Sequence, residues 1–217
     1  MANDVNNVTQ GGSTEGIPGG EEAIPDTKIE RIPWKFMSPL VLGTMMNPLN
    51  STMLATALAT LCNSFKISNG QGAVLITSLY VTATLAQPLM GRLADIYSAR
   101  RVNNLGFLLV MLAALTGIFA PAFGWLVASR ILLGLGTSAA YPSAMALIGR
   151  RYALEGKPVP GTVLALVAMS GQVSLVLGPT LGGLLTQLLG WRGIFIINIP
   201  WVIVALILSS AIPDYRG

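Results

Sequence analysis

Arg130 is the charged residue whose position most needs an explanation, because it lies within a long apolar stretch. A guanidinium there costs at least about 2.5–3.5 kcal/mol on membrane-insertion scales, so we expect it to face the protein interior or a water-filled cavity. Counting by fours from Arg130 gives Gly134 and Ser138, a stripe of small residues against which another helix can pack closely. The alternative is an arginine near a membrane surface whose head group reaches out to water.

Two other apolar stretches each carry a polar face at the three-and-four spacing of a helix. The members are Thr44, Asn47, Asn50 and Ser51 in the first stretch and Thr77, Tyr80, Thr84 and Gln87 in the second. Such groups either form hydrogen bonds between helices, each worth less than about 2 kcal/mol, or line a polar path for a substrate. Both interpretations stay open. The candidates for a path are Asn47, Thr77, Tyr80, Thr84, Gln87 and, from a later apolar stretch, Gln172.

Side chains that commonly serve catalysis or bind metals are scarce. The chain has no histidine and one cysteine, Cys62. These counts exclude an intrachain disulfide and argue against a His/Cys metal site or a His-dependent catalytic dyad. The sequence also lacks a Gly-x-x-x-x-Gly-Lys-Ser/Thr loop for ATP phosphates and an aspartate pair in its apolar stretches. We therefore predict a protein that is not an enzyme and uses no cofactor or metal.

The elements that must position these residues are predicted to be membrane helices. Of the 217 residues, 53% are hydrophobic and 10% are charged, and the mean hydropathy is +0.66; an ordinary soluble domain is about a quarter charged. Six segments reach the roughly 20 residues that one crossing takes. They lie near 39–61, 72–90, 105–123, 126–148, 160–189 and 193–212. The sequence therefore predicts an all-α membrane domain of six transmembrane helices over residues 36–217.

Lysine and arginine gather on one side of these predicted spans. That side carries Lys28, Arg31, Lys35, Arg92, Arg100, Arg101, Arg150, Arg151, Lys157 and Arg216, and the other side carries Lys66 and Arg192. Because such residues are enriched in cytoplasmic loops, we predict a multi-pass protein of the cell membrane with both termini in the cytoplasm. The charge therefore predicts topology and no nucleic-acid partner. Residues 1–35, polar and without apolar periodicity, are predicted to form a disordered cytoplasmic tail.

Part of the second span recurs in the fifth. Pro88, Gly91 and Leu93 correspond to Pro179, Gly182 and Leu184 at one constant offset of 91 residues. The two predicted spans run in opposite directions across the membrane. Related segments of opposite direction are typical of an inverted three-plus-three repeat, which is the plan of transporter halves.

The fifth span combines helix breakers with small residues. Its small residues fall at intervals of four, at Ser170, Ser174, Gly178 and Gly182, with Gly183 beside the last. Pro179 offers no N–H to the carbonyl of Leu175 and so bends the helix. Against a neighbouring helix such a stripe permits close backbone contact. We therefore predict a helix-packing motif here, with Gly91 and Gly134 as its counterparts in other spans.

These motifs resemble those of the major facilitator superfamily. "GRLADIYSARR" (91–101) resembles its loop motif between the second and third helices, and "LVASRILLGLGTSAA" (126–140) resembles its fourth-helix motif. "LGPTLGG" (177–183) resembles a fifth-helix motif associated with antiporters. "LNSTMLATALATL" (49–61) and "GWRGIFIINIPW" (190–201) resemble the first and sixth helices of the fourteen-helix drug/proton antiporter branch.

The resemblance implies the N-terminal half of a secondary transporter that exports small amphipathic compounds or drugs by proton antiport with alternating access. It implies a role in transport or coupling for Arg130, Asp95 and Asn50. At Asn50, however, that branch usually has an acid, and no predicted span contains Asp or Glu. Because asparagine does not titrate, this position lacks the acid through which the branch would couple protons, and Arg130 is the candidate relay.

Asp95 ends the "GRLAD" of the loop motif. Such a carboxylate can cap a helix N-terminus or pair with arginines, and Ser98 is a candidate cap for the third helix. Where the family has a basic residue, a glycine and a second basic residue, this chain has Ile96, Ser98 and Ala99. That departure implies a weaker charge network at the cytoplasmic side.

A transporter of this family needs a second six-helix domain, because one half rocks against the other around a site between them. The expected partners are therefore a C-terminal half or a second half-transporter, besides membrane lipid and a small-molecule substrate. The alternative is a six-helix scaffold or partner subunit that does not transport, or the remnant of a truncated transporter.

Overall fold

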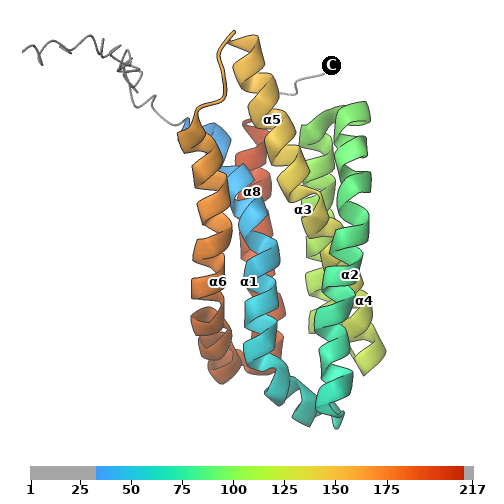
Figure 1. Cartoon of the computed structure of the whole chain (residues 1–217). Helices are drawn as coiled ribbons and strands as arrows, with labels where there is room; N and C mark the ends of the chain where they lie inside the picture. Colours follow the sequence, from blue (N-terminus) through green and yellow to red (C-terminus); the bar gives the residue numbers. More distant parts are fainter. Residues whose placement is uncertain (1–32, 213–217) are drawn as a thin grey trace, which may run out of the picture. The chain divides into compact units, whose positions relative to one another are not determined.

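The computed structural model describes residues 33–212, whose regular elements are all helical (Figure 1). They are α1 (Trp34–Phe65), α2 (Asn69–Leu93), η1 (Ala94–Ser98), α3 (Ala99–Ile118), α4 (Phe123–Ser138), α5 (Ala140–Leu154), α6 (Gly161–Leu189), η2 (Gly190–Arg192), α7 (Gly193–Ile196) and α8 (Asn198–Ser210). The tail predicted over residues 1–35 lies outside the described part of the chain, apart from its last three residues, and so does Arg216.

The turn between α1 and α2 follows from local sequence. Lys66 ends α1 in the left-handed conformation, with φ of 53°. The Ser68 hydroxyl then accepts a hydrogen bond from the backbone N–H of Gln71, and the Gln71 side chain accepts one from the backbone N–H of Ser68. This capping box satisfies two backbone donors that the first turn of a helix leaves unpaired. It fixes where α2 begins.

A π-helical turn, η1, joins α2 to α3. At Ser98 the backbone is extended, with φ of −171° and ψ of 129°, and the chain turns back so that α2 and α3 run in opposite directions (Figure 1). Ser98 occupies the N-cap position of α3, but its side chain makes no capping hydrogen bond. The prediction of a side-chain cap at Ser98 is therefore wrong.

Within residues 33–212, three helical stretches are long and apolar enough to cross a membrane: Asn69–Ile118, Phe123–Leu154 and Gly161–Ile196. The first contains the reversal at Ser98 and thus spans α2 and α3. The second runs past the predicted end at residue 148, because α5 continues α4 after a junction at Ala139. Asn198–Ser210 is a shorter apolar helix. The chain therefore forms an all-α, multi-pass membrane fold.

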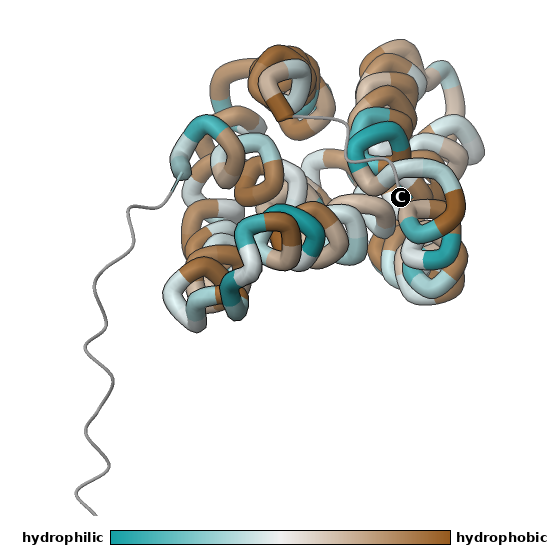
Figure 2. Tube along the Cα trace, turned by 90° about the horizontal axis from the view of Figure 1, so that it is seen from above, coloured by the Kyte–Doolittle hydropathy of each residue, from teal (hydrophilic) through white to brown (hydrophobic). Residues whose placement is uncertain are grey.

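The main helix contacts of this bundle fall into two groups (Figure 1). α1 packs chiefly against α6, and also against α8, whereas α4 packs against both α2 and α3. Figure 2, a view along the bundle axis, shows hydrophobic residues repeated along the helices. Buried hydrophobic clusters fill the space between the helices, one of them built around Leu54, Leu75 and Leu126.

Small residues bring α6 close to α1. Ser170, Ser174, Gly178 and Gly182 are all buried, on one face of α6. A Cβ at Gly178 would collide with the side chain of Thr52, and one at Gly182 would lie 2.8 Å from the Met53 Cα. Since real Cβ atoms do not approach so closely, both positions require glycine for this spacing. Pro179 lies within α6 beside them.

Glycines on α4 bring it equally close to two neighbours. A Cβ at Gly134 would lie 2.8 Å from the Leu79 carbonyl oxygen of α2, and one at Gly136 would lie 2.7 Å from the Gly106 carbonyl oxygen of α3. Gly91 differs, since its Cβ would lie 3.7 Å from the Pro142 side chain in ordinary contact. The glycine that corresponds to Gly182 in the sequence repeat is therefore not a point of close helix approach.

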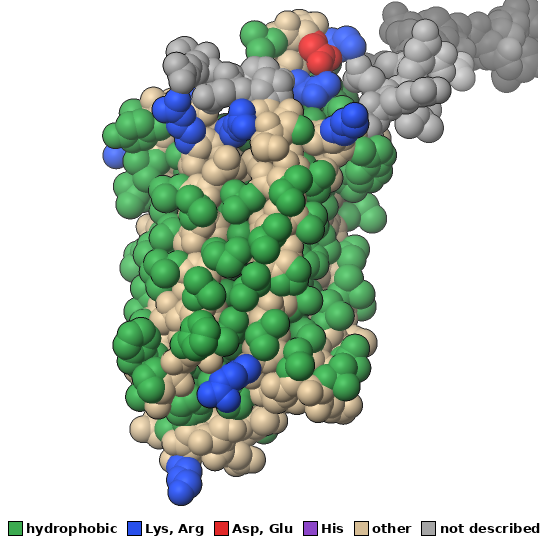
Figure 3. Space-filling view, turned by 180° about the vertical axis from the view of Figure 1, so that it is seen from behind, with side chains coloured by type: hydrophobic (Ala, Val, Ile, Leu, Met, Phe, Trp, Pro, Cys, Tyr) green, Lys and Arg blue, Asp and Glu red, His purple; other side chains and the backbone are tan. Residues whose placement is uncertain are grey.

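The outside of the bundle is apolar. Leu85, Phe119 and Val176 are 73%, 76% and 76% exposed. Hydrophobic side chains cover the middle of the face in Figure 3, while lysine and arginine lie toward its two ends. An apolar exterior of this kind is suited to lipid acyl chains.

Candidate substrate pocket and buried polar core

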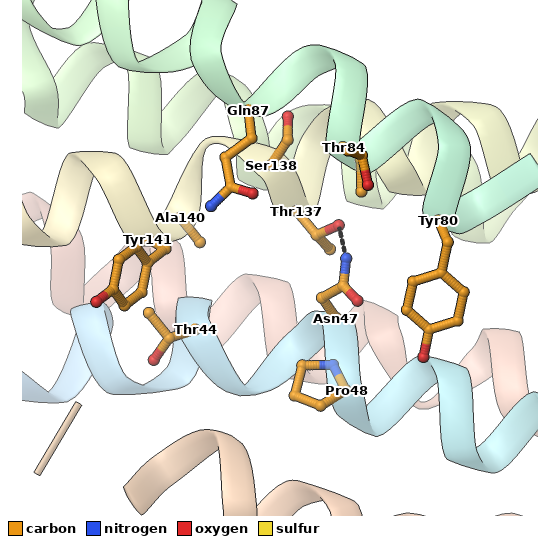
Figure 4. A pocket seen from close by; sticks show the side chains of 11 residues that line it. Thr44, Asn47, Pro48, Tyr80, Thr84, Gln87, Thr137, Ser138, Ala140 and Tyr141 are labelled. Carbon is orange, nitrogen blue, oxygen red and sulfur yellow. Dashed lines mark hydrogen bonds between the residues drawn. The ribbon is translucent and has the colours of Figure 1, made fainter. Parts of the chain in front are cut away.

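A pocket of about 320 Å³ opens between α1, α2 and the junction of α4 with α5 (Figure 4). Its lining consists of Thr44, Asn47, Pro48, Tyr80, Ala83, Thr84, Gln87, Thr137, Ser138, Ala140 and Tyr141. Eight of these carry a hydroxyl or an amide, and none carries a charge. The pocket is therefore a neutral, hydrogen-bonding surface within a largely apolar bundle.

The structure brings together most of the residues named for a polar path. Asn47 comes from α1, and Tyr80, Thr84 and Gln87 come from α2, and all four line the pocket. Thr77 is exposed one turn before Tyr80 and lies outside the lining. Gln172 is also exposed and outside the lining, because α6 turns its small residues, not this side chain, toward α1.

Thr137 and Tyr141 complete the pocket and were not predicted. They come from the end of α4 and the start of α5. Their spacing of four residues places them on one face of a continuous helix, which is the pattern that identified the faces of the first two spans. That spacing was available in the sequence, but the adjacent small residues drew the interpretation toward helix packing.

Some polar groups of the pocket are already engaged within the protein. The Asn47 Nδ2 donates to the Thr137 Oγ1 at 2.9 Å, and the Thr137 hydroxyl donates to the Leu133 carbonyl oxygen at 2.9 Å (Figure 4). The hydroxyl of Ser138 donates to the Leu135 carbonyl oxygen at 2.7 Å. The bond from Asn47 joins α1 to α4 across the floor of the pocket.

One helical turn beyond Asn47, Asn50 is buried and forms a closed pair with Asn198 of α8. Asn50 Nδ2 donates to Asn198 Oδ1 at 2.7 Å, and Asn198 Nδ2 donates to Asn50 Oδ1 at 2.8 Å. The second donor of each amide reaches a carbonyl of its own helix, at Met46 for Asn50 and at Ile194 for Asn198. All donors of this pair are satisfied, so it joins α1 to α8 without a titratable group.

Arg130 lies in the interior of the bundle, 1% exposed, so its head group does not reach out to water. Its guanidinium carbon lies 4.5 Å from the centre of the Phe195 ring of α7. Two of its nitrogens, Nε and Nη2, are buried and have no hydrogen-bond partner among the described residues. A Cβ at Gly117 would collide with the Phe195 ring. Glycine at this position of α3 therefore makes room for the ring that packs against Arg130.

Residues 40–215 match the Major Facilitator Superfamily. The chain belongs to this superfamily. The superfamily consists of transporters and not of enzymes, so the fold described above is part of a secondary transporter fold.

Relatives in this superfamily are longer than this chain. The uncharacterized MFS-type transporter YwoD of Bacillus subtilis is 36% identical over 174 residues, which cover 80% of this chain and 38% of the relative. The putative multidrug resistance protein MdtD of an Enterobacter species is 31% identical over 180 residues, which cover 82% of this chain and 37% of that protein. The chain therefore spans about two fifths of the length of the curated relatives it matches.

A solved structure has the same superfamily fold. The crystal structure of a bacterial homolog of the human lysosomal transporter Spinster, in an inward-facing and unoccupied conformation, matches with a TM-score of 0.73 at 19% identity. The match covers 87% of this chain and 45% of the other chain. At this identity the comparison concerns the fold alone.

The loop motif of the superfamily lies at one end of the bundle. Asp95 falls in η1, is exposed, and makes neither a capping hydrogen bond nor an ion pair with any described residue. Neither local role proposed for it from the sequence is formed.

Proposed function

We propose that this chain forms one half of a secondary active transporter that exports small amphipathic compounds by ion antiport with alternating access. The observation that carries the proposal is the uncharged pocket to which α1, α2 and the α4–α5 junction all contribute polar side chains. Polar groups on lipid-facing helices would be costly, whereas groups that converge on one hollow can bind a solute. The likeness to a putative multidrug resistance protein supports export of drug-like compounds.

We propose that the elements form six spans arranged as an inverted three-plus-three repeat. The breaks at Ser98 and between α6 and α7 divide the long helical stretches into pieces of suitable length. Pro88 of α2 and Pro179 of α6 occupy matching positions in helices that run in opposite directions (Figure 1). The gathering of arginines where α2 and α5 end supports a cytoplasmic location for that end and for both termini.

Proton coupling, in this proposal, proceeds through Arg130 and not through Asn50. The Asn50 amide is hydrogen-bonded to Asn198 and does not titrate, so it cannot take up or release a proton in a transport cycle. Among residues 33–212 the acids are Asp95 and Glu155, and both are exposed. Neither of these exposed acids lies beside the buried Arg130, so the acid that responds to it is proposed to come from outside residues 33–212, for example from a second half or from the substrate. Asp95 is proposed to contact that second half during the transport cycle.

The partner completes the transport path, since an alternating-access cycle needs two halves. We propose that a C-terminal half or a second half-transporter covers the open side of the pocket. The substrate would then be enclosed between the two halves, while the apolar exterior remains in contact with lipid.

Flux in proteoliposomes tests the proposal. The protein, as its gene encodes it, is reconstituted, and release of preloaded methylumbelliferyl glucoside, which is neutral, and of ethidium, a cation, is followed with and without an imposed pH gradient. We expect the gradient to stimulate release of at least one compound and a protonophore to remove the stimulation. Replacing a pocket residue by Gln87→Leu should reduce the flux, and the matched change Gln187→Leu, at an exposed position of α6, should not.

The outcomes separate the parts of the proposal. Flux that ignores the pH gradient would refute proton antiport and leave transport in place. An absence of flux for every compound tried, with the protein correctly inserted, would favour the alternative of a scaffold or partner subunit.

A further inference from the structure

We infer that the pocket between α1, α2 and the α4–α5 junction selects uncharged compounds that combine an aromatic ring with several hydroxyl or amide groups. The inference rests on the proposed function and names the chemical class of its substrate. It depends on which polar groups of the lining are still available and on the absence of charge around them (Figure 4).

The available groups are all neutral and lie on two helices that face each other. Within residues 33–212, the side chains of Thr84 and Gln87 on α2 make no hydrogen bond. Asn47 uses its amide nitrogen to reach Thr137, which leaves its carbonyl oxygen for a ligand. Gln87 supplies two donors and an acceptor, and Thr84 supplies one donor and acceptor oxygen. A ligand with hydroxyls or amides can match this set from both sides.

A charged ligand finds no counter-charge in this lining. The lining residues, all of them within residues 33–212, include no Lys, Arg, Asp or Glu. Transfer of an ion from water into a low-dielectric site without an opposite charge costs far more than transfer of a neutral polar group that forms hydrogen bonds there. The pocket lining that accepts a polyol therefore disfavours the binding of cations and anions alike.

Two tyrosines provide the aromatic part of the recognition. Tyr80 and Tyr141 stand at opposite ends of the pocket, 48% and 51% exposed, and neither hydroxyl bonds to another described residue (Figure 4). Aromatic pairs in offset or edge-to-face geometry attract each other beyond the effect of their buried area. A ring on the ligand can pack on either tyrosine, while its polar part reaches the amides and hydroxyls between them.

A matched set of three fluorescent probes tests charge selection. Methylumbelliferyl glucoside is neutral, the glucuronide carries a carboxylate in place of one hydroxymethyl group, and the glucosaminide carries an amine in place of one hydroxyl. Binding is measured by equilibrium dialysis with the complete protein in lipid nanodiscs, without any ion gradient. We expect the glucoside to bind at least about tenfold more tightly than either charged probe. No binding of the glucoside, or equal binding of a charged probe, would overturn the inference.

A charged residue introduced into the pocket lining should reverse the preference for the neutral probe over a probe of opposite charge. Gln87→Glu is expected to strengthen binding of the glucosaminide about tenfold and to weaken binding of the glucuronide, since a charge-assisted hydrogen bond replaces a neutral one. The control is Gln187→Glu, which adds the same charge at an exposed position of α6 outside the pocket. An equal effect of both variants would show that net charge, and not this pocket, sets the selection, and would overturn the inference.

The binding measurement tests the inference, and the flux measurement tests the proposed function, so the two can fail independently. If charged compounds are transported and bind as well as the glucoside, the inference is wrong and the proposed transport stands. If the glucoside binds selectively but no compound is transported, the pocket keeps its assigned chemistry and the proposed function is wrong.

Discussion

Asn47 and Asn50 lie one turn apart on α1, yet their amides are used differently. Asn47 is half-buried and lines the open pocket, with a carbonyl oxygen that bonds to no described residue. Asn50 is 1% exposed and closed into a reciprocal pair with Asn198. Three residues rotate an α-helix by about 300°, so the two side chains diverge by about 60°. Because of this angle, the amides of Asn47 and Asn50 face different neighbouring helices.

The difference shows that a polar side chain in an apolar helix takes its role from the element opposite. Opposite Asn50, α8 supplies a second asparagine of complementary geometry, and the result is a joint between two helices. Opposite Asn47, the α4–α5 junction supplies one hydroxyl and a hollow, and part of the amide stays available. Of the two interpretations left open for the polar faces, interhelical bonding therefore describes Asn50, while the polar path stays a proposal for Asn47, which lines the pocket.

Replacing Arg130 by methionine is expected to have the largest effect. Transport should be abolished, while the free energy of unfolding should rise by about 1–3 kcal/mol, because buried guanidinium nitrogens without partners give way to an apolar chain of similar length. Flux in proteoliposomes and thermal unfolding in detergent measure the two quantities. A fall in stability together with the loss of flux would instead give Arg130 a structural role like that of Asn50.

Breaking the asparagine pair should have the next largest effect. Asn198→Leu leaves the buried Asn50 amide unpaired, which should lower the free energy of unfolding by about 1–3 kcal/mol. Replacing both residues by leucine should recover most of that loss, since no buried donor then lacks a partner. The measurement is a double-mutant cycle on thermal unfolding. Equal destabilisation by the single and double variants would contradict the closed pair.

Truncating Asn47 should have the smallest effect on stability. Asn47→Ala removes one half-buried hydrogen bond to Thr137, so the free energy of unfolding should change by no more than about 1 kcal/mol. Binding of methylumbelliferyl glucoside should weaken by about fivefold, which corresponds to one lost hydrogen bond. If Asn47→Ala destabilised the protein as much as Asn198→Leu does, the distinction between pocket and core would fail.

Helix packing was more accessible to prediction than the polar contacts. The small residues at intervals of four on α6 lie against α1, because a 3.6-residue turn keeps such positions on nearly one face. The polar faces of α1 and α2 were also found by spacing, and four of the predicted path residues line one pocket. The pairing of Asn50 with Asn198 was not predictable, because it joins positions 148 residues apart through the packing of α8. The close contact between the Phe195 ring and Gly117 was likewise not predictable, because it too depends on how helices distant in the sequence pack together.

The sequence by itself determined the chemistry of this protein: an apolar helical chain with lysine and arginine at its loops and one arginine inside a helix. These properties depend on composition and period, which the chain carries before it folds. The tertiary structure alone decided which polar groups are closed and which are available. That choice depends on how α8 and the α4–α5 junction meet α1, because each polar group is closed or available according to the element packed opposite it.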